Sequence, residues 1–216
     1  MPLIDKINTG PFGVNTYIVP LEGSKVFLVD PAACDYSGDK FVISSFLESR
    51  HLEPEAIVLT HGHFDHIAGL PHLVSCYPGI RIYIHPADAP LVGRNSEAGQ
   101  LRSLGAMGFT EFLPYVSNLP EPTDYLDDGE RILGGWKVFH TPGHTPGSCC
   151  LYSEKEKVLL SGDTVFYHSW GRTDLPGGDE SVMSASLERI YTIIPKDTLV
   201  FSGHDATGFD LSENLP

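Results

Sequence analysis

The chain has 216 residues, of which 41% are hydrophobic, and carries a formal net charge of −14 at pH 7. This length and composition predict one globular domain spanning residues 1–216. The acidic excess argues against a nucleic-acid partner, because phosphate binding requires a basic surface. No apolar run approaches the roughly eighteen residues that span a bilayer, so we expect no membrane partner either.

The first residues and the cysteines indicate the compartment. Residues 1–6 lack the basic segment and long apolar stretch of a secretory signal. The cysteines Cys34, Cys76, Cys149 and Cys150 have neither metal-binding nor redox spacing, and buried free thiols are the default for such residues. We therefore expect a cytoplasmic protein in a reducing compartment.

Short apolar runs bounded by turn-forming residues predict strands that alternate with helical patterns. The strands are expected at residues 17–19, 26–30, 57–60, 80–85, 137–140, 150–152, 158–160 and 199–201. Residues 40–49 form the first helical pattern, with a buried face of Phe41, Ile43, Phe46 and Leu47. Residues 86–112 are expected to carry a helical excursion near the functional site, and residues 113–135 a long connection.

The second helical pattern covers residues 181–194, where apolar side chains recur at helical spacing. Its predicted buried face consists of Val182, Met183, Leu187, Ile190, Tyr191 and Ile194. Asp179 or Ser181 is expected to cap this helix, and Pro195 to end it.

A run of potential metal ligands follows the strand at residues 57–60. It places three imidazoles and one carboxylate within six residues, namely His61, His63, Asp65 and His66. Imidazole nitrogen supported by carboxylate oxygen suits first-row transition metals, and Gly62 permits a close turn. A polar surface loop is the alternative interpretation, but the chain has only ten histidines in all, so this concentration favours a metal-binding segment.

Three further candidate ligands stand at the ends of other apolar runs and beside glycine. These are His144, Asp163 and His204. For any one of them alone a structural role would be the better interpretation, but together with the first run they predict a divided metal site on loops at the edges of strands. We expect His140, Thr145 and Ser148 to brace the loop around His144 rather than to touch substrate.

From about Asn15 to the C-terminus, the order His-x-His-x-Asp-His, then His, Asp and His, resembles the metallo-β-lactamase superfamily. The resemblance implies an α/β (α+β) fold, a four-layer αββα sandwich of two mixed β-sheets flanked by helices. It also implies two divalent metal ions, zinc in the first place, with iron or manganese as alternatives. The ligands carried over are His61, His63 and His144 for the first ion, Asp65, His66 and His204 for the second, and Asp163 as the bridge.

Asp30, which ends the strand at residues 26–30, matches an acidic position of the superfamily. The resemblance implies that it orients a ligand histidine, and a turn-forming Asp-Pro pair is the plainer alternative. Within the superfamily the chain is similar to the glyoxalase II-type hydrolases, especially a short bacterial branch marked by residues 171–178. The related persulfide dioxygenases carry a similar Gly-Arg-Thr-Asp segment.

The glyoxalase II resemblance implies hydrolysis of a thioester such as S-lactoylglutathione or a related acyl thiol, and hence a small anionic or thioester substrate as the partner. The longer enzymes of this type add a C-terminal helical domain that grips glutathione. Since this chain ends twelve residues after His204, we expect residues 86–126 or 167–178 to hold any thiol carrier.

Two metals held close together lower the pKa of a bridging water, so hydrolysis is the simplest activity. Asp65, as a ligand beside that water, is the candidate catalytic residue. Arg172, Tyr167 and His168 are candidate substrate-binding residues, against an internal pair of Arg172 with Asp174 and plain aromatic packing.

Three other functions stay open at this level. One is a persulfide dioxygenase with a single iron held by His61, His144 and Asp163. The second is an iron–oxygen electron-transfer domain of the flavodiiron kind, which resembles this fold but typically has an acidic residue where His63 stands. The third is a non-catalytic metal-binding scaffold on the same fold. The sequence decides neither the resident metal nor the oligomeric state.

Overall fold

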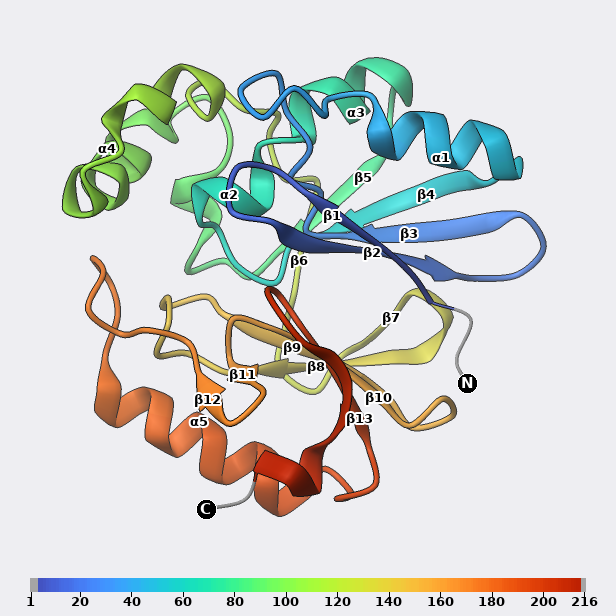
Figure 1. The fold of residues 1–216 in the computed structure, drawn as a ribbon, viewed down its shortest axis with the longest axis vertical. Coiled ribbons are helices and arrows are strands. Elements are labelled where there is room, and N and C mark those ends of the chain that lie inside the picture. Colours follow the sequence, from blue (N-terminus) through green and yellow to red (C-terminus); the bar gives the residue numbers. More distant parts are fainter. Residues whose placement is uncertain (1–3, 215–216) are drawn as a thin grey trace.

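A computed structural model describes residues 4–214 of the chain. Within them, two mixed six-stranded sheets pack face to face (Figure 1). The first has the order β1-β2-β3-β4-β5-β6, with β1 (Asp5–Thr9), β2 (Val14–Pro20), β3 (Lys25–Val29), β4 (Glu53–Val58), β5 (Arg81–Ile84) and β6 (Asp124–Tyr125). Strands β1 to β3 pair antiparallel, whereas β3 to β6 pair parallel.

The second sheet has the order β14-β13-β10-β9-β8-β7. Its strands are β7 (Arg131–Ile132), β8 (Trp136–His140), β9 (Cys149–Ser153), β10 (Val158–Gly162), β13 (Leu199–Ser202) and β14 (Thr207–Asp210). Strands β10 and β13 pair parallel and the other neighbours antiparallel. A small hairpin of β11 (Val165–Phe166) and β12 (Ser169–Trp170) stands beside it.

Helices cover the outer faces of both sheets (Figure 1). Over the first sheet lie α1 (Val42–Arg50), α2 (Phe64–Ile67), α3 (Leu70–Cys76) and α4 (Glu97–Met107), and against the second lies α5 (Glu180–Ile193). Short 3-10 turns are η1 (Ala89–Leu91), η2 (Thr110–Tyr115), η3 (Leu133–Gly135) and η4 (Leu211–Asn214). The predicted four-layer αββα sandwich of two mixed sheets is confirmed. Among the described residues, no helix combines the length and apolar composition needed to cross a bilayer.

The strands are apolar on both faces because each sheet is covered on both sides. Side chains alternate along a strand, so in β3 Leu28 packs towards the helices while Phe27 packs between the sheets. In β9, Leu151 packs between the sheets while Cys150 and Tyr152 pack towards α5. Continuous apolar runs, rather than alternating ones, are what such doubly covered strands require.

All of the predicted strands coincide with observed ones, and both helical patterns form helices. The side chain of Asp179 caps α5 by accepting the backbone N–H of Ser181 and Val182. The extended backbone of Ile194, before Pro195, ends it. The strands that the prediction missed include β1, β6, β7 and β14. Strands β6, β7 and β14, like β11 and β12, have only two to four residues, which are too few to show the alternation of apolar and polar side chains that identifies a strand.

Some predicted core positions are wrong. Phe41 is 63% exposed, because α1 begins only at Val42 and Phe41 lies outside its buried face. Val182, in the first turn of α5, is 37% exposed, and Phe46, Leu187 and Tyr191 are only partly buried. Cys76, at the last position of α3, is exposed, whereas the other cysteines are buried as predicted.

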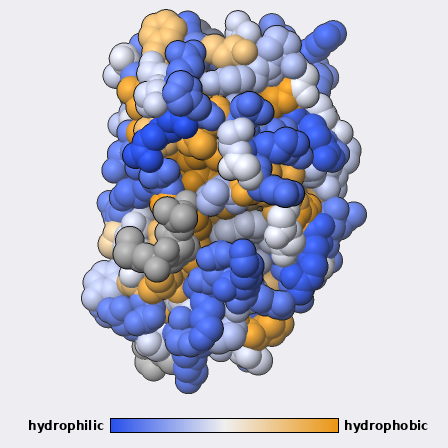
Figure 2. Space-filling view, turned by 90° about the vertical axis from the view of Figure 1, so that its right-hand side faces the viewer, coloured by the Kyte–Doolittle hydropathy of each residue, from blue (hydrophilic) through white to orange (hydrophobic). Residues whose placement is uncertain are grey.

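The side of the molecule that carries the turn between β2 and β3 faces the viewer in Figure 2. Its surface is largely hydrophilic, in keeping with the net charge of −14. Hydrophobic atoms gather there in the space between the two sheets. The metal-ligand candidates lie elsewhere, where other loops of the two sheets meet.

Leu151→Ala tests the layer of core between the sheets. Leu151 is fully buried there, so the substitution should lower the free energy of unfolding by about 2–5 kcal/mol through lost burial and an unfilled cavity. Urea unfolding followed by circular dichroism measures the change. Ile193→Ala is the control, because Ile193 is 51% exposed and its truncation should change stability by less than about 0.5 kcal/mol. Equal losses in both variants would contradict the layered core.

Candidate metal centre

Seven candidate ligands meet at one edge of the sandwich, where strands of both sheets end. The first run begins at His61, three residues after the end of β4, and continues into α2, while His144, Asp163 and His204 follow β8, β10 and β13. Ligand atoms of His61, His63 and His144 lie within 4.8 Å of one another, and so do those of Asp65, His66 and His204. The structure therefore brings together the two sets that the resemblance implied.

A hydrogen bond behind His61 fixes which ring nitrogen faces the site. The Thr60 hydroxyl donates to Oδ2 of Asp30 (2.6 Å), so its oxygen is left to accept the Nδ1–H of His61 (3.1 Å). Nε2 of His61 then carries the lone pair, and this buried atom has no partner among the described residues. A second buried ring nitrogen, Nε2 of His63, also lacks one, but the other nitrogen of this ring, Nδ1, is the one that faces His144. Such unpartnered buried atoms are costly unless something binds them.

His144 is oriented in the same way. Its Nδ1–H donates to the backbone carbonyl of Arg172 (2.7 Å), which leaves Nε2 free to bind a metal. That Nε2 lies 2.8 Å from Nδ1 of His63. Together with Nε2 of His61, these nitrogens form a three-imidazole donor set.

The histidines of the second set are also oriented by hydrogen bonds from the ring nitrogens that face away from the site. Nδ1–H of His66 donates to Oδ2 of Asp30 (3.0 Å), and Nδ1–H of His204 donates to the carbonyl of Phe12 (3.2 Å). Their Nε2 atoms then face each other at 3.2 Å, with Oδ2 of Asp65 3.4 Å from that of His204. Asp30 therefore orients one ligand of each set, His66 directly and His61 through Thr60. Its side chain is buried, with 1% exposure.

The Asp163 carboxylate faces both sets. Its Oδ1 lies 3.5 Å from Nε2 of His66, and its Oδ2 lies 3.6 Å from Nε2 of both His144 and His204. Oδ1 is buried with no hydrogen-bond partner in the described part of the chain. A Cβ atom at position 203 would come 2.2 Å from this oxygen, so only glycine fits at Gly203.

The electrostatics of the site favour cations. Burial lowers the pKa of His61 and His63 well below the ordinary value, which keeps both neutral, as metal ligands must be. Burial also opposes charge on His66, but Asp163, Asp65 and Asp30 outweigh it and raise its pKa to about 10. The carboxylates of Asp163, Asp65 and Asp30 thus lie close enough to this ring to favour a positive charge there. The donor set and its unpartnered atoms fit two divalent metal ions.

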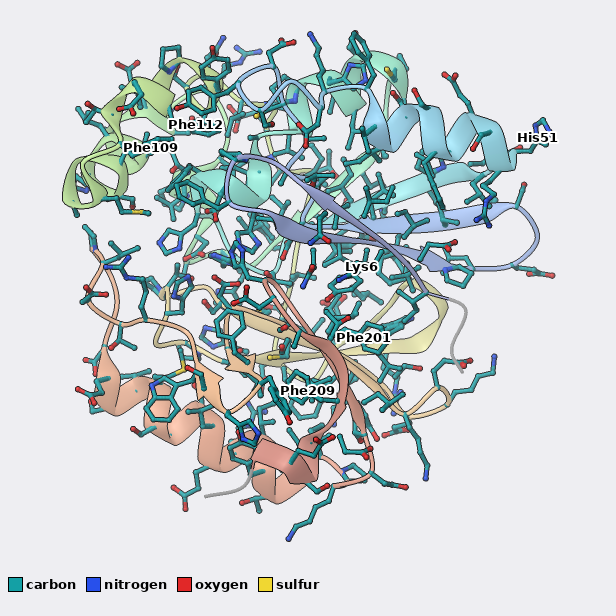
Figure 3. The ribbon with its side chains drawn as sticks, in the orientation of Figure 1. Lys6, His51, Phe109, Phe112, Phe201 and Phe209 are labelled. Atoms are coloured by element: carbon teal, nitrogen blue, oxygen red, sulfur yellow. The ribbon has the colours of Figure 1, made fainter. Side chains whose placement is uncertain are left out.

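A cavity of about 340 Å³ opens beside the ligands. Its apolar lining consists of Phe12, Phe64, Met107, Phe166 and Leu175. Phe12 packs edge-to-face on Phe64 and Phe109, with ring centroids 5.6 and 5.2 Å apart. Phe109 and Phe112 lie on the upper left of Figure 3, in the segment after α4, so the predicted helical excursion does reach the site.

The structure places the candidate substrate-binding residues as follows. The Arg172 guanidinium makes a bidentate pair with Asp174, at 2.7 and 2.8 Å, although Arg172 also lines the cavity. Tyr167 packs on His168 and Phe209, with ring centroids 4.0 and 5.3 Å apart. Neither Tyr167 nor His168 is among the described residues that line the cavity.

Two residues of the site were missed in the sequence. Phe12 lies on the turn between β1 and β2, with no pattern around it that indicates a site. Asp88 follows β5 at the same edge of the sheet as the ligands and is fully buried, which raises the pKa of its carboxyl group. Its signal was available, because an acidic residue soon after a predicted strand is the pattern that identified Asp163.

The comparisons with known proteins agree with this geometry. A family model described as the metallo-beta-lactamase superfamily matches residues 9–204. An uncharacterized protein of Aquifex aeolicus (strain VF5) is 36% identical over 207 residues, which cover 94% of this chain and 89% of that protein. The probable metallo-hydrolase YqgX of Bacillus subtilis (strain 168) is 33% identical over 198 residues, 86% of each chain. The chain belongs to the metallo-β-lactamase superfamily, a superfamily of metallo-hydrolases.

Two solved structures are similar over nearly the whole chain. BLEG-1 B3 metallo-beta-lactamase has a TM-score of 0.84 at 30% identity, covering 98% of this chain and 95% of its own. TTHA1623 in a di-iron-bound form has a TM-score of 0.81 at 32% identity, covering 97% and 96%. A hydroxyacylglutathione hydrolase of Klebsiella pneumoniae subsp. pneumoniae is 30% identical over 194 residues, 88% of this chain but 61% of that enzyme.

Asp163→Ala tests the bridging position. Because the carboxylate faces both ligand sets, its loss should reduce the bound metal from about two ions per chain to one or fewer. Elemental analysis of the purified protein measures this. Asp210→Ala, an exposed position on β14, should retain the metal content of the wild type. Full metal content in Asp163→Ala would rule out the bridge.

Proposed function

We propose that the chain is a metal-dependent hydrolase that cleaves a thioester with an apolar acyl group, by means of a water activated between two metal ions. The observation that carries the proposal is the pairing of two complete ligand sets, faced by the single carboxylate of Asp163, with an adjoining apolar cavity. Zinc suits this donor set, and iron and manganese are the alternatives.

When bound, the two divalent ions polarise a substrate carbonyl and supply a hydroxide at neutral pH. The residues of the chain perform the remaining tasks. Asp30 fixes the orientation of His66 directly and that of His61 through Thr60. Partial burial would raise the pKa of Asp65, whose side chain is 13% exposed, but His66 and His204 outweigh it and hold the pKa well below its usual range. A carboxylate that stays ionised suits a ligand that also accepts a hydrogen bond from the attacking water.

The cavity lining favours an apolar acyl group over a charged one. The aromatic rings of Phe12, Phe64 and Phe166 offer area for apolar burial and exclude water from the reacting carbonyl. Arg172 is the arginine among the described lining residues, and its guanidinium is already paired with the carboxylate of Asp174. A thiolate is a good leaving group and needs little help from an acid.

The relatives support hydrolysis. One is named a probable metallo-hydrolase and another a hydroxyacylglutathione hydrolase, although the chain covers only 61% of the length of the latter. The alternative single-iron dioxygenase would need only His61, His144 and Asp163. The presence of Asp65, His66 and His204 in ligand geometry favours the dinuclear hydrolase over it, and likewise over a non-catalytic scaffold.

The first test is an activity assay of the metal-loaded protein. Aromatic and aliphatic thioesters of a small neutral thiol should be cleaved with kcat/KM of at least about 10⁴ M⁻¹s⁻¹, and S-lactoylglutathione less efficiently. Released thiol is followed with a chromogenic reagent, and protein stripped of metal by a chelator is the control. Oxygen uptake on glutathione persulfide without thioester cleavage would overturn the proposal. Hydrolysis of a chromogenic cephalosporin alone would redirect it to β-lactams.

Phe12→Ala tests the apolar wall. The substitution should raise KM for a benzoyl thioester by about tenfold, because the ring that would contact the acyl group is lost. The effect on an acetyl thioester should be much smaller. Phe41→Ala is the matched control, because Phe41 is 63% exposed and lines other surface pockets. An equal change for both substrates would argue against a specificity role for Phe12.

A further inference from the structure

A fully buried carboxylate, that of Asp88, lies between the two loops that carry the first ligand set. Its Oδ2 accepts the backbone N–H of Gly62 (2.8 Å) and the hydroxyl of Thr145 (2.7 Å). Its Oδ1 accepts the backbone N–H of Gly147 (2.7 Å). Asp88 itself belongs to neither loop, since it follows β5 and precedes η1.

The loop at Gly62 is held from its other side as well. The side-chain nitrogen of Gln100, fully buried on α4, donates to the carbonyl of Gly62 (2.8 Å) and to that of Leu91 (2.7 Å). Both polar groups of the Gly62 backbone are thus fixed by side chains: the N–H by Asp88 and the carbonyl by Gln100. The ligands His61 and His63 are the neighbours of Gly62 in the chain.

The packing around Asp88 leaves no free space for either loop to shift towards it. A Cβ atom at Gly147 would lie 2.6 Å from Cγ of Asp88, and one at Gly62 would lie 2.7 Å from Cβ of Leu91. Contacts this close are possible only with glycine at both positions. Both loops therefore pack closely against the segment that carries Asp88 and Leu91.

We propose that Asp88 is a positioning residue for the first metal: it joins the loop of His61 and His63 to the loop of His144 and so sets the distance between their ring nitrogens. It acts through the backbone of Gly62 and through the residues that follow His144, without touching a ligand ring. Its hydrogen bonds reach no residue of the second set, Asp65, His66 and His204. The inference depends on the metal centre and not on the identity of the substrate.

The geometry predicts that loss of the Asp88 carboxylate lowers the affinity for one metal only. A residue that merely stabilised the fold would affect both metals alike. A buried carboxylate is costly to desolvate, and an apolar residue of similar volume would often stabilise a fold equally well. A carboxylate that receives three hydrogen bonds from two ligand loops instead provides directional control of both. Partners that orient metal ligands typically contribute 10- to 100-fold in metal affinity.

Asp88→Asn is the main test, because it keeps the shape but turns one acceptor into a donor that opposes a backbone N–H. Metal-free protein is titrated with Zn²⁺ against a chromophoric chelator, which resolves the affinities of the two binding steps. One step should weaken by about tenfold or more, while the other stays within about twofold. Unchanged affinities, or equal weakening of both steps, would overturn the proposal.

Asp39→Asn is the matched control. The Asp39 carboxylate also links two loops, through the backbone N–H groups of Gly10 (2.7 Å) and Cys34 (2.9 Å), but neither loop carries a metal ligand of the first set. Urea unfolding of both metal-free variants measures the general loss of stability. Asp39→Asn should lose stability and retain the zinc affinity of the step that weakens in Asp88→Asn. Weakening of the same zinc step in this control would overturn the specific role of Asp88.

A second pair of variants decides the matter if Asp88→Asn does not fold. Thr145→Val removes the hydroxyl that donates to Asp88 and keeps the side-chain shape, whereas Thr145→Ser keeps the hydroxyl. The first metal step should weaken in Thr145→Val and recover in Thr145→Ser. Equal affinities in the two variants would mean that the link to Asp88 does not position the ligands.

Discussion

The buried carboxylate of Asp30 is the interaction on which the metal centre depends. It accepts hydrogen bonds from the backbone and hydroxyl of Thr60 and from the ring of His66, so one acidic group at the end of β3 orients ligands of both sets. Its own position is fixed because β3 and β4 run parallel and end side by side. A charge this deeply buried needs several hydrogen bonds, and those bonds also fix the tautomers of the ligand histidines.

The sandwich makes such a centre possible because loops from both sheets open onto one edge. The first sheet supplies the dense run after β4, and the second supplies single ligands after β8, β10 and β13. Buried carboxylates collect there, and cations are the natural counterpart of that charge. On the other side of the ligands the lining is aromatic, drawn from the β1–β2 turn, α2 and the region around β11. The metal ligands and the aromatic lining of the cavity thus lie next to one another.

Much of the fold could be predicted, because strands covered on both faces appear as apolar runs and helices as stripes. The errors have a common origin. Phe41 and Val182 match the periodicity, but Phe41 immediately precedes α1 and Val182 lies in the first turn of α5, and both side chains are exposed. The shortest strands have no periodicity to detect. For Arg172 the sequence left two interpretations open, a pair with a substrate carboxylate and a pair with Asp174, because a guanidinium binds either carboxylate equally well. The structure shows the bidentate pair with Asp174.

The sequence by itself determined the chemical identity of the ligands and their order, because imidazole and carboxylate donors after apolar runs are a local pattern. The periodicity of each element also predicted strands that alternate with helices, whereas the layered architecture was implied by the resemblance of the ligand pattern to the metallo-β-lactamase superfamily. Only the tertiary structure decided which ring nitrogens face the centre, and that Asp88 and Phe12 belong to the site. These features depend on contacts between segments far apart in the chain, and such contacts leave no periodic signal in the sequence.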